Sequence, residues 1–267
     1  MSKKSLRTTG TGALLPWLIP AALLTLWFAV SEGGLVPAYL LPHPLEIGRA
    51  GYAYLLGSPG EAPYAGRFAS DLSASLLRVV LGFGLAVAVG IPLGVLSGRL
   101  ATVNRLLSTS INALRAVPGI CWLPLAMVWF GIGMKTTVFL VALAAFFPVY
   151  LNAAAGARSV NVIYYQAGAM MGVSRLRGAF FILLPAAMPS IITGLRLGMG
   201  ISWAYLVLGE LTGVTNGLGA VIMDARMLGR IDIIVVGIIL IALIGRLCDR
   251  LLHQFMKLCF KSARRMA

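Results

Sequence analysis

The chain contains six apolar stretches, each about as long as a helix that crosses a membrane. Such a helix needs about 20 mostly apolar residues to span the hydrocarbon core of a bilayer. Only 11% of the 267 residues are charged, whereas soluble domains carry about 25%. The sequence therefore predicts an all-α membrane protein with six transmembrane helices, at 13–31, 75–96, 107–131, 137–156, 186–210 and 233–255.

The basic residues fall mainly on one side of this six-helix arrangement. The net charge is +14, and with Met1 in the cytoplasm most Lys and Arg outside the spans lie on the cytoplasmic side, in line with the positive-inside rule. They flank apolar runs and form no patch interleaved with aromatic residues, so we expect no nucleic-acid partner. The expected order is a cytoplasmic N-terminus (1–12), an anchor helix (13–31), a periplasmic segment (32–74), a five-helix core (75–256) and a basic cytoplasmic tail (257–267).

The first apolar stretch has the basic start of a secretory signal peptide. It is longer than the 7–15 apolar residues of such a peptide, so we expect it to stay as an anchor helix. After it, the periplasmic segment is expected to form one short surface helix behind Pro44, where Leu45, Tyr52 and Leu56 recur with helical spacing. His43, between two prolines, is expected to be structural.

The longest expected cytoplasmic loop, 157–185, carries the signals of two short helices. Gly172 is a natural end for the first helix, and the hydroxyl of Ser174 can cap the second. Pro185 is expected to end that second helix. Because both helices have apolar side chains to spare, the loop is expected to contact either the bundle or another protein.

Few residues in the chain could perform chemistry. The two histidines, His43 and His253, lie at opposite ends of the chain, and the three cysteines match no metal-binding or redox spacing. No lysine follows a glycine, so the chain has no P-loop for ATP. We therefore expect no metal, no cofactor and no catalysis, and a membrane enzyme is the weaker interpretation. An ion channel or an autonomous carrier remains an alternative.

The same loop carries a family resemblance. Its sequence, QAGAMMGVSRLRGAFFILLP, resembles the signature loop of permease subunits of binding-protein-dependent ABC importers, with Gly172 as the motif glycine and Leu184 and Pro185 as the closing pair. The segments LLPHP, LRVVLGFGLAVAVGIPLGVLSG, LRAVPGICWLPLAMVWFGIG and NGLGAVIMDAR are similar to the nitrate/sulfonate/taurine group of these permeases. The resemblance therefore covers nearly the whole chain and implies a type I ABC importer permease fold.

The resemblance also implies that other subunits supply the energy for transport and deliver the substrate. The loop would form a coupling helix that docks on a separate ATP-binding cassette ATPase. A periplasmic or lipid-anchored substrate-binding protein would deliver the substrate, and a second permease copy would complete a homodimer among the lipids of a bacterial inner membrane. Gln166 stands where the motif usually has an acid, so no salt bridge is expected there. The implied coupling residues are Gln166, Ala167, Gly168, Gly172, Leu184 and Pro185.

Charged and aromatic residues within the spans are candidates for a translocation pathway. Arginine suits an oxyanion because its guanidinium makes bidentate contacts, and the group that the chain resembles implies a sulfonate, taurine or nitrate as the substrate. The alternatives are a structural Arg–Glu pair between helices and, for the tryptophans, packing or anchoring at the membrane interface. The candidates are Arg115, Trp122, Arg196, Trp203 and Glu210.

Overall fold

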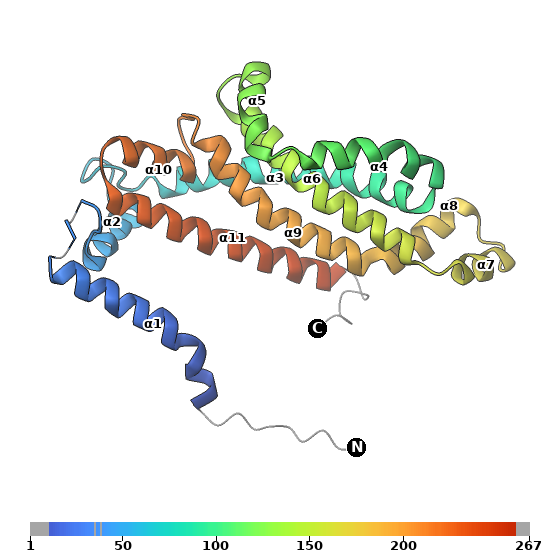
Figure 1. The fold of residues 1–267 in the computed structure, drawn as a ribbon, viewed down its shortest axis with the longest axis horizontal. Helices are drawn as coiled ribbons and strands as arrows, with labels where there is room; N and C mark the ends of the chain where they lie inside the picture. Colours follow the sequence, from blue (N-terminus) through green and yellow to red (C-terminus); the bar gives the residue numbers. More distant parts are fainter. Residues whose placement is uncertain (1–10, 35, 38, 260–267) are drawn as a thin grey trace.

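The computed structural model describes residues 11–34, 36, 37 and 39–259, and it is an elongated bundle of helices (Figure 1). Most of the predicted N-terminal segment and of the basic tail lies outside the described residues. The longer helices are α1 (Thr11–Glu32), α3 (Phe68–Arg99), α4 (Ala101–Ala116), α6 (Met134–Ser159), α9 (Leu184–Glu210) and α11 (Ile231–Cys259). The shorter ones are α2 (Pro44–Leu56), α5 (Trp122–Phe130), α7 (Val162–Met170), α8 (Arg175–Gly178) and α10 (Leu218–Met227).

Five helical segments of the described chain are long and apolar enough to cross a membrane, and they match five of the six predicted spans. The remaining span, predicted as one helix over 107–131, is broken: α4 and α5 meet at an angle of 85°. Pro118 explains the break, because it has no N–H to donate and holds Val117 in extended backbone (φ −73°, ψ 120°). After a single 3-10 turn, α5 leaves in a new direction and projects from the bundle (Figure 1).

Helices α3, α6 and α9 form the centre of the bundle. Small residues let α3 and α6 approach closely, as in many membrane proteins. A Cβ atom on Gly94 of α3 would lie only 2.5 Å from the carbonyl oxygen of Tyr150 on α6. The buried core around this contact consists mainly of Ala145, Val149, Ala153, Ala187, Ile191, Ile192 and Leu195.

Replacing Gly94 by leucine is expected to force α3 away from α6 and to lower the thermal unfolding midpoint of the solubilised protein. Overpacking typically costs about 1–3 kcal/mol, and here the obstacle is backbone, which yields less than a side chain. Gly84→Leu is the matched control, because a Cβ at Gly84 on the same helix meets no atom within 4 Å. Equal midpoints for the two variants would contradict the close α3–α6 contact.

Helix α2 lies at the end of the bundle that also carries α10 (Figure 1). It buries Ile47, Ala50 and Tyr54 against α11 and its neighbours. The short helix predicted after Pro44 is confirmed, although two of the apolar residues whose spacing indicated it, Leu45 and Tyr52, are 61% and 67% exposed. Both faces of this helix are apolar, and the face with the small Ala50 is the one that fits against α11.

His43 has the structural role that its position between two prolines predicts. Its Nδ1 atom accepts a hydrogen bond from the N–H of Leu45 (3.2 Å) and so caps the first turn of α2. Its Nε2 atom lies 3.0 Å from a carboxylate oxygen of Glu32. This contact ties the end of α1 to the start of α2. None of the residues from Leu15 to Glu32 is buried in the chain, so α1 stands largely apart from the bundle (Figure 1).

A continuous helical segment of 36 residues runs from Arg175 to Glu210, through α8, a π-helical turn (Ala179–Leu183) and α9. The expectation that Pro185 ends a helix is wrong. In the π turn the N–H of Leu184 bonds to the carbonyl of Ala179, five residues earlier. The wider turn moves backbone carbonyls away from the proline ring, which would otherwise clash with the preceding turn.

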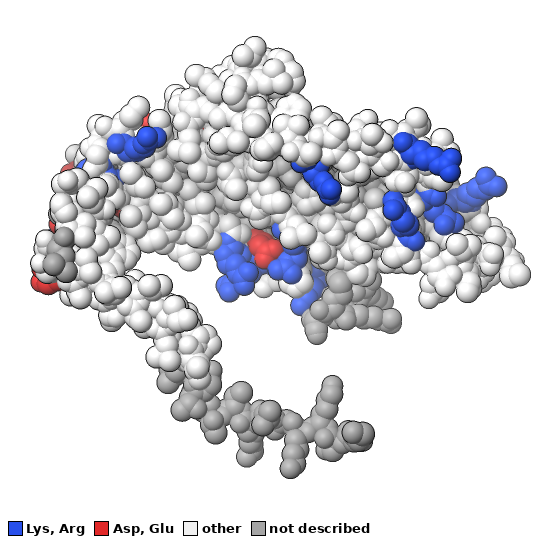
Figure 2. Space-filling view, in the orientation of Figure 1, with Lys and Arg blue, Asp and Glu red and all other residues white. Residues whose placement is uncertain are grey.

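The surface of the bundle is largely uncharged on the face that Figure 2 presents. Basic side chains gather at the end of that face that carries α7 and α8. The basic residues at this end of the helices are Arg99, Arg105, Arg158, Arg175 and Arg177.

Candidate coupling segment and translocation site

The predicted meeting of two short helices near Gly172 is confirmed. Gly172 adopts a left-handed conformation (φ +75°), which a glycine reaches without the steric cost of a side chain. Its N–H bonds to the carbonyl of Ala169, and the N–H of Val173 bonds to the carbonyl of Gly168 (2.9 Å). This pair of bonds is the Schellman arrangement that closes a helix C-terminus. The hydroxyl of Ser174 then accepts from the N–H of Arg177 and caps α8, as expected.

The residues predicted to dock on an ATPase differ in their exposure to solvent. Gln166 and Ala167 are exposed on α7, whereas Gly168 is buried. A Cβ on Gly168 would lie 2.6 Å from Cδ1 of Ile182, so the glycine lets α7 approach the π turn. Leu184 and Pro185 lie farther along, at the start of α9. The exposed part of the candidate coupling segment therefore comprises α7, the turn that follows it and the first residues of α8.

Large apolar side chains cover the exposed side of this segment. Met170 is 90% exposed, Met171 75%, Leu176 74% and Ile163 63%. Surfaces of this kind mark protein contacts when they lie outside the membrane, and methionines adapt readily to a partner. A hollow of about 580 Å³ lies behind the segment, between α7, α8 and the end of α3. There the guanidinium of Arg99 stacks on the ring of Tyr165, 3.8 Å from its centre.

The break between α4 and α5 creates a hollow of about 420 Å³ against α6 and α9. Two of the predicted pathway residues, Arg115 and Trp122, line it from opposite sides of the break. Tyr205 of α9 adds a hydroxyl, and Phe147 and Pro148 of α6 add apolar wall.

Arg115 is the unusual member of this hollow. Among the described residues its guanidinium has no ion-pair or hydrogen-bond partner. It lies 14 residues along α4 from Ala101, which is about 21 Å of helix, and its side chain is exposed in the single chain. The sequence has no acidic residue between Asp71 and Glu210, and hence no side chain of α4, α5, α6 or α9 before Glu210 could neutralise it.

The other three predicted pathway residues lie elsewhere. Arg196 makes a bidentate ion pair with Asp249 of α11, with both N–O distances at 3.0 Å. Trp203 is buried in the core, 4% exposed, between α9 and its neighbours. Glu210 is fully buried and bonds to Arg78. None of the three lines the hollow at Arg115. For Glu210, the structure matches the Arg–Glu alternative between helices.

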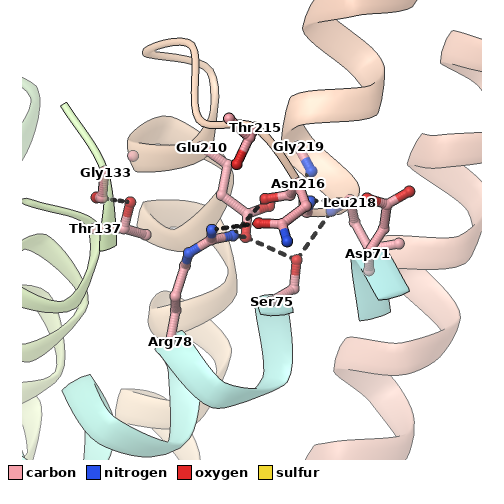
Figure 3. A network of polar contacts seen from close by, with 12 residues as sticks. Asp71, Ser75, Arg78, Gly133, Thr137, Glu210, Thr215, Asn216, Leu218 and Gly219 are labelled. Carbon is pink, nitrogen blue, oxygen red and sulfur yellow. Dashed lines mark hydrogen bonds and ion pairs between the residues drawn. The ribbon is translucent and has the colours of Figure 1, made fainter. Parts of the chain in front are cut away.

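Glu210 belongs to a buried polar network at the end of α9 (Figure 3). Its Oε1 atom accepts from Nη1 of Arg78 (2.6 Å) and from the hydroxyl of Ser75 (2.7 Å). Its Oε2 atom accepts from the backbone N–H of Gly219 (2.8 Å). Arg78 also donates to the carbonyl of Asn216 (2.7 Å). These bonds fix the turn between α9 and α10 to α3.

Asp71 extends the same network to α2. One of its oxygens accepts from the backbone N–H of Gly217 (3.0 Å) and the other from the hydroxyl of Tyr54 (3.1 Å). Ser75 accepts from the N–H of Leu218 (2.9 Å), so three successive N–H groups at the start of α10 are bonded to side chains of α3 and α9. Burial beside the Asp71 carboxylate raises the pKa of Tyr54 above its usual value, which keeps the phenol a donor.

Sequence reasoning missed most of this network. Arg78 sits inside a long apolar run, and its partner Glu210 comes from a helix far along the chain. One signal was available: Asp71, Ser75 and Arg78 are spaced by four and three residues, which places them on one helix face. In the described part of the chain, no group of three or more His, Cys, Asp or Glu side chains could hold a metal ion.

Comparison with known proteins places the chain in a family. The family of binding-protein-dependent transport system inner membrane components matches residues 90–257. The chain is 37% identical to the taurine transport system permease protein of Escherichia coli (strain K12), over 86% of this chain and 82% of that protein. It is 31% identical to the nitrate import permease protein of Synechocystis sp., over 88% of this chain and 85% of that protein.

The fold also has a counterpart among solved structures. A chain of the MetNI methionine ABC transporter, in an inward-facing conformation, superposes with a TM-score of 0.56 over 70% of this chain and 95% of its own. At 19% identity this likeness bears on the fold alone. The expected family and fold are confirmed, and a binding-protein-dependent system implies a separate ATPase and a binding protein as partners. This chain therefore belongs to the binding-protein-dependent transport system inner membrane components, as a non-catalytic, multi-pass permease of an ABC importer.

Proposed function

We propose that this permease carries a small oxyanion, of the sulfonate, taurine or nitrate class, from the periplasm into the cytoplasm. The observation that carries the proposal is the guanidinium of Arg115, which has no partner in the described chain and lines the hollow between α4, α6 and α9. An unpaired arginine within a membrane-spanning segment is expensive, and such residues commonly mark the path of a substrate or ion. The names of the taurine and nitrate relatives agree with this substrate class.

Trp122 and Tyr205 complete the proposed site. Both line the hollow with Arg115, and the Tyr205 hydroxyl and the indole N–H of Trp122 are hydrogen-bond donors suited to an oxyanion. We assign Arg196, Trp203 and Glu210 to structural contacts instead, because each is held by partners outside the hollow.

The proposed topology puts α7 and α8 in the cytoplasm, together with both termini. The cluster of basic residues at that end of the bundle supports it under the positive-inside rule. The exposed apolar side of α7 and its following turn would then seat on the ATPase, with Gln166 contributing hydrogen bonds and no charge. A second permease copy would complete the membrane unit as a homodimer.

Reconstitution into liposomes with the ATPase and the binding protein tests the transport proposal. We expect ATP-dependent accumulation of at least one of taurine, methanesulfonate and nitrate, and none of a neutral analogue of similar size. Accumulation by the permease without its ATPase would instead favour an autonomous carrier. Accumulation of the neutral analogue alone would contradict the oxyanion assignment.

The coupling role of the segment is tested by Gly172→Val. A residue with a side chain costs about 1–2 kcal/mol in the left-handed conformation, so we expect uptake and ATPase activity coupled to it to fall roughly tenfold. Space is not the cause, since a Cβ at Gly172 meets no atom within 4 Å. Gly84→Val on α3, which also points into open space, is the control. Unchanged uptake with normal membrane insertion would count against a coupling helix.

A further inference from the structure

A second hollow, of about 270 Å³, lies between α4 and α6 on the side of Arg115 that faces the proposed cytoplasmic end. Leu151 lines both hollows, so the two adjoin. On α4 the second hollow is lined by Asn104, Ser108 and Asn112, which recur every four residues on one helix face. On α6 it reaches Arg158 in the last turn. A row of polar side chains thus leads from Arg115 toward the end of the bundle.

The polar groups of this hollow have donors left for a further acceptor. Nη2 of Arg158 donates to Oδ1 of Asn104 (3.1 Å), and the hydroxyl of Ser97 donates to the same oxygen (3.2 Å). With its oxygen occupied, the Asn104 amide keeps its N–H groups for another partner. Within the described residues, the side chains of Ser108 and Asn112 make no hydrogen bond.

Among the residues that line this hollow, the only charged one is Arg158. No acidic residue lines it, and the acid-free sequence between Asp71 and Glu210 supplies all of its walls. The Ser97 hydroxyl that holds Asn104 is itself held, because it accepts from the hydroxyl of Tyr150 (2.7 Å). Arg158 is therefore kept at the mouth of the hollow by a fixed chain of hydrogen bonds, with donor capacity remaining.

We propose that this hollow is a second station for the transported anion on its way to the cytoplasm, with Arg158 as its cation and Asn104 as the residue that positions Arg158. The inference rests on the proposed oxyanion function. If the anion bound only at Arg115, it would have to dissociate from one strong site directly into the cytoplasm. Two weaker sites in series, in two adjoining hollows that each contain an arginine, would keep binding favourable and release fast, as in selective pores.

Thiol labelling tests the second station without relying on transport. The assembled permease–ATPase complex would carry Ser108→Cys, with the three native cysteines replaced by serine. Its labelling rate would be measured with an anionic reagent, 2-sulfonatoethyl methanethiosulfonate, and a cationic one, the trimethylammonium analogue. We expect the anionic reagent to be favoured and Arg158→Gln to lower the anion-to-cation rate ratio about tenfold. Millimolar methanesulfonate should slow labelling in the presence of Arg158 and not in its absence.

Matched variants separate local charge from other effects. Arg105→Gln removes a charge from the same end of α4 but lies outside both hollows, so its rate ratio should equal that of the parent. Arg158→Lys should keep most of the ratio, whereas Asn104→Leu should lower it by releasing Arg158. Equal ratios with and without Arg158 would overturn the proposal. An introduced thiol that neither reagent reaches would also overturn it, since a station must admit the anion.

These outcomes are distinct from failure of the proposed function. An importer that accumulates only neutral solutes refutes the oxyanion assignment, whatever the labelling ratio. Loss of anion uptake in Arg115→Gln together with a labelling ratio insensitive to Arg158 refutes the second station alone.

Discussion

Replacing Arg78 by methionine is expected to lower the free energy of unfolding by about 3–5 kcal/mol, the usual cost of leaving one member of a buried ion pair without its partner. Arg78 and Glu210 are 6% and 0% exposed, and their closest atoms are 2.6 Å apart. Without the guanidinium, the Glu210 carboxylate would stay in a dry site with only Ser75 and one backbone N–H to bond it. Unfolding of the solubilised protein, followed by tryptophan fluorescence, measures the loss.

Two further variants show whether the buried charge is the cause. Arg78→Met combined with Glu210→Gln removes the stranded charge, so it should recover roughly half of the lost stability or more. Arg230→Met is the control: its partner Asp232 lies only 2.7 Å away, but the Arg230 side chain is 38% exposed. Exposed pairs are worth about 0–1 kcal/mol. A loss as small for Arg78 as for Arg230 would mean that the network is not a structural anchor.

Arg115→Gln is expected to lower uptake of the transported anion by about 30-fold or more, because removing one member of a charge contact that the bound anion would bury costs at least about 2 kcal/mol of binding. Stability should hardly change, since Arg115 has no partner among the described residues to leave unpaired. The initial rate of uptake into liposomes, at equal amounts of reconstituted protein, measures the effect.

The lysine variant shows what the guanidinium itself contributes. Arg115→Lys keeps the charge but loses the planar pair of donors, so we expect an intermediate rate, with the larger loss for planar nitrate. Arg105→Gln on the same helix should transport normally. If Arg115→Gln carried its anion at the rate of the parent protein, the hollow at the α4–α5 break would not be the anion site.

Local signals made much of the fold predictable. Long apolar runs marked five of the spans, Gly172 marked the turn between α7 and α8, and Ser174 marked the cap that follows it. The errors came from prolines. Pro118 was included in one span although it breaks the helix there, and Pro185 was expected to end a helix although a π turn carries the helix through it. Whether a proline breaks or only widens a helix depends on the neighbouring turns and packing, which a short sequence window does not contain.

The candidate site was predictable only in part, for a similar reason. Arg115 and Trp122 were predicted because one is a charged and the other an aromatic residue within the same apolar span. Arg78 and Glu210 are brought together by the packing of α3 against α9, and neither sequence neighbourhood contains the other. Asn104, Ser108 and Asn112 form a row only once α4 is known to be a helix whose polar side meets α6.

The uninterrupted helix from Arg175 to Glu210 has a mechanical consequence. At 36 residues it is a rod about 54 Å long, with the proposed ATPase contact at one tip and the carboxylate that clamps the α9–α10 turn at the other. A tilt imposed on the inner tip must displace the outer turn, unless the rod yields at the π turn between the two. The stiffness of that single turn would then decide how much of a movement at the ATPase end of the helix is transmitted to the opposite side of the bilayer.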